Sequence, residues 1–156
     1  MPRRLASLSA LVLLACGACS SPSPDAMRTE VQQVVRAYVD ANNKADVTAM
    51  MEMMSRAPGV SSVNDGSITR GWDAIRTAND AVVGKVSGYN MAFGSIDVLP
   101  VGATTALVVA PVTITVTAGE RSSQESGAMT LVLEKSDKSW KIIHEHYSSQ
   151  PEAQGD

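Results

Sequence analysis

The sequence predicts a single α+β domain in which three helices precede a curved, mostly antiparallel sheet. Apolar residues recur at helical spacing between residues 25 and 83, and from residue 89 to residue 148 they follow the spacing of strands. No cysteine occurs after Cys19, so disulfides are not expected to hold the domain together. A chain of 156 residues is long enough for one domain to bury its own core.

Three helices are expected in the first half of the chain. The first spans about residues 25–43, and the second is shorter, begins after Asp46 as its cap and stops near Pro58. The third opens at Gly71 and runs to about residue 83. One face of the first helix is apolar, with Val31, Val34, Val35, Tyr38 and Val39 at helical spacing.

Strands are expected on both sides of the third helix. Residues 60–63 and 67–70 flank Asn64-Asp65-Gly66, a sequence typical of a tight hairpin. Three longer strands are expected at residues 89–99, 104–117 and 127–135. The strand at residues 140–148 closes the sheet.

The closing strand carries two histidines. A strict period of two places His144 and His146 on the face that also holds Trp140 and Ile142. The same period places Lys141, Ile143, Glu145 and Tyr147 on the opposite face.

Three patterns, in this order, resemble the SnoaL-like and nuclear transport factor 2-like superfamily. They are Val-Arg-Ala-Tyr-Val at residues 35–39 followed by Asp46, Gly-Trp-Asp-Ala-Ile-Arg at residues 71–76, and the last hairpin at residues 131–148. The resemblance covers residues 27–149. It implies a cone-shaped, cystatin-like roll with a cavity between helices and sheet, and the contents of that cavity differ among members of the family.

The amino terminus resembles a bacterial lipoprotein signal. Arg3 and Arg4 precede a largely apolar run, residues 5–15, that is shorter than the ~20 residues needed to span a bilayer. We expect a signal peptide at residues 1–15, lipidated Cys16 and a tether at 16–26, the domain at 27–149 and a polar tail at 150–156. Cys19 is the alternative lipidated residue. The protein is then exported and held by its lipid in the bacterial cell envelope, on the periplasmic face and at the outer membrane where the cell has one.

Charge and composition exclude nucleic acid as an expected partner. The formal net charge is −3, and 4% of the residues are aromatic. No cluster of lysine and arginine is present to neutralise phosphates. No cofactor is expected.

Six residues are candidates for a ligand pocket: Tyr38, Asp65, Trp72, Asp97, His144 and His146. Tyr38 falls where ketosteroid isomerases of this fold keep a tyrosine that donates to a developing oxyanion, although a core tyrosine is the alternative. The isomerase also needs a carboxylate base near residues 61–63, and the nearest one, Asp65, lies on a turn. The sequence leaves open which face of the sheet holds Asp97.

The two histidines allow three roles: a general base, a pair of metal ligands or structural hydrogen bonding. Because no third ligand accompanies them, we expect no metal. The family resemblance favours His146 over His144. Met50, Met51, Met53 and Met54 could bind Cu(I) in an exported protein, whereas core packing is their common use.

Two classes of function follow. The first is a lipid-anchored binding or assembly module that holds a small apolar molecule and pairs two copies through its open sheet face, as a homodimer. The second is a small SnoaL-like enzyme with isomerase, cyclase or hydratase chemistry in an apolar pocket. Copper binding by the methionines is a further alternative. No carboxylate base could be assigned, which favours the first class.

Overall fold

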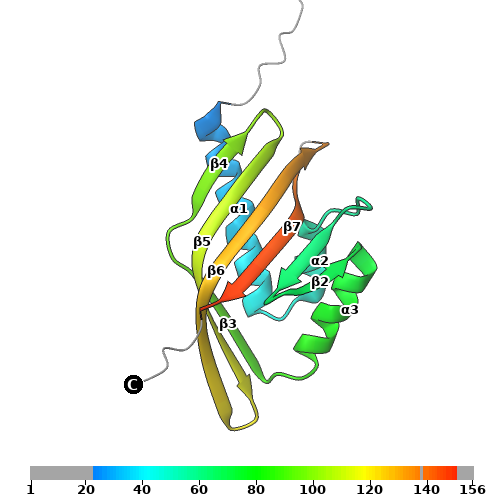
Figure 1. The fold of residues 1–156 in the computed structure, drawn as a ribbon, viewed down its shortest axis with the longest axis vertical. Helices are drawn as coiled ribbons and strands as arrows, with labels where there is room; N and C mark the ends of the chain where they lie inside the picture. The colour runs from blue at the N-terminus through cyan, green and yellow to red at the C-terminus, as the bar shows by residue number, and fades with distance from the viewer. Residues whose placement is uncertain (1–22, 138, 151–156) are drawn as a thin grey trace, which may run out of the picture.

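The computed structural model describes residues 23–137 and 139–150. The described residues form three helices and seven strands (Figure 1). The helices are α1 (Pro24–Asn43), α2 (Val47–Met53) and α3 (Trp72–Val83). The strands are β1 (Ser61–Asn64), β2 (Ser67–Arg70), β3 (Gly88–Phe93), β4 (Asp97–Val101), β5 (Thr105–Ala118), β6 (Arg121–Ser136) and β7 (Ser139–Ser149).

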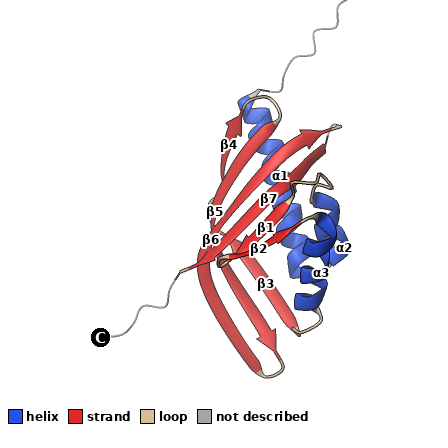
Figure 2. Ribbon diagram, turned by 45° about the vertical axis from the view of Figure 1, so that its right-hand side comes forward, coloured by secondary structure: helices blue, strands red, loops and turns tan. Residues whose placement is uncertain are grey.

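The strands form one curved sheet in the order β2-β1-β7-β6-β5-β3, and β4 also pairs with β5. β1 runs parallel to β7, and the other pairs between strands are antiparallel. The three helices lie on one side of this sheet, and its other side carries none of them (Figure 2). This arrangement confirms the predicted fold class.

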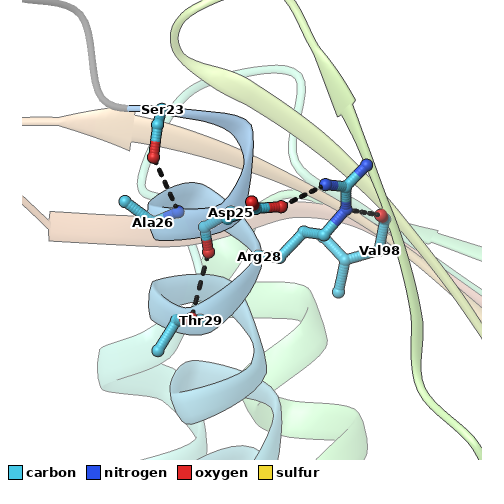
Figure 3. A network of polar contacts seen from close by, with 6 residues as sticks. All are labelled: Ser23, Asp25, Ala26, Arg28, Thr29 and Val98. Atoms are coloured by element: carbon cyan, nitrogen blue, oxygen red, sulfur yellow. Dashed lines mark hydrogen bonds and ion pairs between the residues drawn. The ribbon is translucent and has the colours of Figure 1, made fainter.

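The first turn of α1 is fixed by its cap and by a contact with the sheet (Figure 3). The Ser23 hydroxyl accepts a hydrogen bond of 3.2 Å from the Ala26 amide, as an N-cap residue does. Arg28 pairs with Asp25 at 2.8 Å and donates at 3.3 Å to the Val98 carbonyl on β4. The start of the helix is thereby tied to the edge of the sheet.

The strand expected at residues 89–99 is in fact two strands, β3 and β4. Regular pairing with β5 is interrupted at residues 94–96, where the Gly94 amide still donates to the Pro111 carbonyl at 2.9 Å. A Cβ at Gly94 would lie 2.8 Å from Pro111 Cγ, so a larger residue cannot make this close approach. β6 also begins earlier than expected, at Arg121, because it pairs with β5 along its whole length.

A β-bulge in β7 makes the predicted faces of this strand wrong. Leu133 of β6 pairs with Ile142, whereas its neighbour Val132 pairs with His144, so Ile143 is an extra residue in β7. Alternation restarts after the extra residue. Trp140 and Ile142 are buried before the bulge, and Glu145 and Tyr147 are buried after it. His144 and His146 therefore lie on the opposite, helix-free face.

The core lies between the helices and the concave face of the sheet. Met50, Met51 and Met54 are buried in it, and Met53 packs against it half-buried. The methionine cluster is thus core packing, an observation that disfavours the copper alternative.

The predictions for the amino terminus fall outside this part of the molecule. Cys16, Cys19 and the expected signal peptide precede the described residues, and so does most of the expected tether. Between residues 23 and 150, leaving out 138, no helix is long and apolar enough to cross a membrane.

Candidate functional site

A cavity opens between α1, α3 and the concave face of the sheet. It consists of an inner chamber of about 100 Å³ and an outer one of about 250 Å³. Six residues line both chambers, which are therefore adjacent: Asn42, Asn64, Asn79, Tyr89, Ile114 and Tyr147. Tyr38, Met91, Met129 and Glu145 belong to the wall of the inner chamber alone.

A hydrogen bond between Tyr38 and Glu145 crosses the inner chamber. The Tyr38 hydroxyl on α1 donates to Oε2 of Glu145 on β7 over 2.6 Å. Glu145 is 8% exposed and is the one charged residue that is buried in the described part of the chain. Within the same residues, no cation forms an ion pair with it. A buried carboxylate with one neutral partner is unusual, because burial disfavours an unpaired charge.

The state of Tyr38 follows from its surroundings. Burial, and then the negative charge and hydrogen bond of Glu145, raise the pKa of Tyr38 well above its ordinary value of 10.0. The hydroxyl consequently keeps its proton, and Tyr38 acts as a donor to Glu145. The Asn42 amide donates to the Tyr38 backbone carbonyl at 2.8 Å one turn later along α1.

Two further tyrosines face this pair, and the three together are all the tyrosines of the chain. Burial, and then the charge of Glu145, raise the pKa of Tyr89 to about 12. Burial, and then the charges of Glu125 and Asp65, raise the pKa of Tyr147. The Tyr147 hydroxyl is buried and forms no hydrogen bond of ordinary geometry with the described residues, although the Glu125 carboxylate lies close enough to raise its pKa.

Gly127 on β6 gives the Tyr147 ring its position. A Cβ at residue 127 would lie 2.8 Å from the ring atom Cε2 of Tyr147 and would also collide with the Ser148 carbonyl oxygen. The absence of a side chain at Gly127 therefore lets the ring lie against the strand beside the outer chamber.

The structure brings one of the six predicted pocket residues, Tyr38, into this cavity. Asp65 lies on the turn between β1 and β2, where its carboxylate accepts hydrogen bonds from the Ser149 amide at 2.7 Å and the Ser149 hydroxyl at 3.0 Å. Asp97 is exposed on β4 and pairs in register with Val109, on the helix-free side of the sheet.

Trp72 lies in a separate groove between α2, α3 and the start of β7. Its indole N–H donates to the Met51 carbonyl at 3.0 Å, and the Arg56 guanidinium stacks 3.7 Å from the centre of its ring. The groove is also lined by Arg76 and Lys141, and both acidic and basic side chains line it.

The two histidines lie side by side outside the cavity. Their ring centres are 6.4 Å apart, and His144 shares a 2.9 Å hydrogen bond with the Ser61 hydroxyl. His146 is exposed on the helix-free face. Neither Asp65 nor Asp97 meets them there, so these four candidates form no carboxylate and histidine pair.

Glu145 is the functional candidate that the sequence interpretation missed. A strict alternation put this residue on the outer face, and the bulge at Ile143 reverses that placement. The available signal was the adjacent pair Ile142-Ile143, because two consecutive apolar residues break the alternation of a half-buried strand.

The cavity can hold a small molecule against carboxylate acceptors and hydroxyl and amide groups. The Glu145 carboxylate can accept a hydrogen bond or a proton, and the Tyr147 hydroxyl can donate. No group of three His, Cys, Asp or Glu residues in the described part of the chain could hold a metal ion.

Comparisons with known proteins agree with the fold. The model of the SnoaL-like domain family matches residues 31–152. A nuclear transport factor 2-like superfamily protein from Salmonella enterica is 21% identical, with a TM-score of 0.77 over 85% of this chain and 96% of the other. A comparison with curated proteins finds no match.

Two other solved structures carry names that refer to dehydration. A proposed dehydratase of the NTF2-like family from Streptomyces avermitilis has a TM-score of 0.76 at 17% identity, over 82% of this chain and 99% of its own. A proposed scytalone dehydratase from Novosphingobium aromaticivorans has a TM-score of 0.73 at 13% identity, over 80% and 85% of the two chains. At these identities the likeness shows the fold alone. By its match to the family model and by its fold, the chain belongs to the SnoaL-like domain family and has the nuclear transport factor 2-like, cystatin-like fold.

Proposed function

We propose that this domain is a binding module whose cavity takes a small molecule with an apolar body. The observation that carries the proposal is the buried Tyr38–Glu145 pair at the inner end of an open cavity. A buried carboxylate and the unpartnered Tyr147 hydroxyl are costly when nothing binds them. A bound molecule would supply their missing partners.

The outer chamber supports the apolar part of this proposal. Its wall includes five aliphatic side chains from α3, the segment after it, and β5: Val82, Val83, Val86, Ile114 and Val116. Apolar walls with a few polar groups are typical of small-molecule sites.

The proposal is tested by filling the inner chamber. Ser62 and Ser61 are neighbours on β1, but Ser62 lines the chamber, and Ser61 bonds to His144 on the outer face. Calorimetric titration of the full chain with small aromatic amines, alcohols and acids should detect binding of at least one of these classes to the wild type and to Ser61→Leu. Ser62→Leu should lose that binding while circular dichroism shows an intact fold. Equal binding by both variants, or no binding to the folded wild type, would refute the proposal.

A second candidate is an acid–base enzyme, favoured by the same carboxylate. Glu145 is 8% exposed, and a carboxylate in such a wall can take a proton from the carbon next to an oxygen-bearing group of the ligand. The Tyr147 hydroxyl could then donate a hydrogen bond to that oxygen. This candidate predicts that a bound compound is converted, as followed by NMR, and that Glu145→Gln binds without converting it. If a compound binds and is not converted, the enzyme is refuted and the binding module remains.

We also propose export, lipid attachment at Cys16 and pairing of two copies. Lipid attachment is supported by Arg3, Arg4 and the apolar run before Cys16, and intact mass measurement of Cys16→Ser against the wild type tests it. Pairing is supported by exposed apolar residues on the helix-free face of the sheet, among them Leu99 and Val109.

A further inference from the structure

We infer that the molecule bound in this cavity is a small organic cation, an amine with a flat apolar body. The inference rests on the proposed binding function and adds the charge of the ligand. Three features carry it: the charge of the lining, the unsatisfied hydroxyl of Tyr147 and the aromatic wall.

The lining of the cavity is acidic. Glu145 lies in the inner chamber and Glu125 at the wall of the outer one. No lysine, arginine or histidine lines either chamber. Since charges interact more strongly in a low-dielectric interior, the cavity attracts a cation and repels an anion.

Glu145 lacks the partner that a buried carboxylate ordinarily has. It is 8% exposed, and Tyr38 is the one side chain of the described residues that hydrogen-bonds to it. A neutral hydroxyl leaves the charge uncompensated, whereas an ammonium would form a charge-assisted hydrogen bond with it. The ligand is the natural source of this missing positive charge.

The Tyr147 hydroxyl is the independent second observation. This residue is 5% exposed, lines both chambers and has an oxygen without a hydrogen-bond partner in the described structure. The pKa values of Tyr147 and Tyr89 are raised, so both phenols stay neutral. Tyr89 then offers a lone pair near Glu145, and Tyr147 offers one near Glu125. An ammonium has three N–H donors and no acceptor, which suits a lining of carboxylate and phenolic oxygens.

The rings and aliphatic walls decide between an organic cation and a metal ion. Tyr38, Tyr89 and Tyr147 surround the carboxylate with aromatic surface, to which an organic ammonium is attracted. The outer chamber has one carboxylate, Glu125, and its five aliphatic side chains can cover the apolar body of an amine, which a bare metal ion lacks. No set of three metal-binding side chains occurs among residues 23–137 and 139–150.

Three probes of one shape and different charge test the inference. We would titrate the full chain with benzylamine, benzyl alcohol and benzoate and measure each dissociation constant by calorimetry. Benzylamine should bind about 10- to 100-fold more tightly than benzyl alcohol, because it adds a hydrogen bond to a charged group. Benzoate should show no binding.

Charge-neutral variants locate the effect. Glu145→Gln should remove the preference for benzylamine over benzyl alcohol, because the amide can still accept from Tyr38 but carries no charge. Glu134→Gln makes the same change at an exposed residue of β6, outside the lining of both chambers, and should keep the preference. Glu125→Gln, at the wall of the outer chamber, should weaken the binding of benzylamine by a smaller factor. It is the variant to use if Glu145→Gln does not fold.

The outcomes separate this inference from the proposed function. Equal binding of benzylamine and benzyl alcohol would refute a cationic ligand but not the proposed binding cavity. Tighter binding of benzoate than of benzylamine would also refute a cationic ligand. Absence of binding by all three probes to a folded chain would overturn both.

Discussion

At the scale of single residues, the site depends on a helix tyrosine and a strand carboxylate that lie far apart in the sequence. Tyr38 keeps its proton because burial and the charge of Glu145 raise its pKa, and Glu145 keeps an acceptor oxygen in a protein interior. Neither residue alone would create a reactive or selective site. Their pairing, 107 positions apart, gives the cavity its polarity.

The tyrosines give the cavity a signal at alkaline pH. All three tyrosines of the chain line it, and the pKa of each is raised, that of Tyr89 to about 12. A pKa that is higher in the folded state stabilises the fold fully below the unfolded value of 10.0, and that stability is lost as the pH rises toward and through the folded value.

Tyrosinate absorbance is therefore expected to stay low near pH 10 in the folded protein and to rise toward about 12 together with loss of the circular dichroism signal. In denaturant, the same tyrosines should ionise near the ordinary value of 10.0. If tyrosinate forms at that pH while the fold persists, the phenols are not held as the structure indicates.

The sequence predicted one half of this pair and missed the other. Tyr38 could be placed because helical spacing and the family resemblance both point to the inner face of α1. Glu145 could not, because one extra residue in a strand reverses every later side chain. The same extra residue, Ile143, places His144 and His146 on the helix-free face of the sheet and not in the cavity. The candidate site thus depends on a detail of register that the alternating pattern does not contain.

At the scale of elements, the helices were predictable and the strand ends were not. Capping residues and apolar spacing set α1 and α2 within the chain, and both begin close to the expected positions. β3 and β4 were merged although the core-facing apolar positions change from odd to even across residues 94–96, from Met91 and Phe93 to Ile96 and Val98. That change of face was the local signal of an interrupted strand.

Deletions in β7 test the role of the bulge. Removing Ile143 should convert the bulge to regular pairing and keep Ile142 and Glu145 on the inner face, at a cost of about 1–2 kcal/mol for a half-buried side chain. Removing Lys141 instead brings Trp140 and Ile142 next to each other, so that one of two buried side chains must turn outward. This variant should lose more than about 3 kcal/mol.

Denaturant unfolding followed by circular dichroism would compare the two deletions. The benzylamine preference would report the position of Glu145, which the Ile143 deletion should retain. Equal destabilisation by both deletions would contradict the assignment of Ile143 as the extra residue.

At the scale of the whole molecule, the helices cover one face of the sheet and leave the other open (Figure 2). The open face has apolar side chains along β4, β5 and β6: Leu99, Val101, Leu107, Val109 and Val132. Leu99 is 58% exposed and Val109 is 43% exposed, in a region where soluble monomers ordinarily carry polar residues. A second copy, packed through the same face by a two-fold axis, would bury this surface while leaving the cavity on the other side of the sheet free.

Pairing through this face predicts that a charge placed there separates the copies. Leu99→Lys and Val109→Lys should each convert a dimer to a monomer at micromolar concentration in analytical ultracentrifugation, because an interface of this kind does not tolerate an unpaired buried cation. Val82→Lys places the same charge on an equally exposed apolar residue of α3, on the helix side, and should leave the dimer intact. A wild type that sediments as a monomer would refute the pairing. Dissociation by Val82→Lys alone would instead place the contact between copies on the helices, next to the mouth of the cavity.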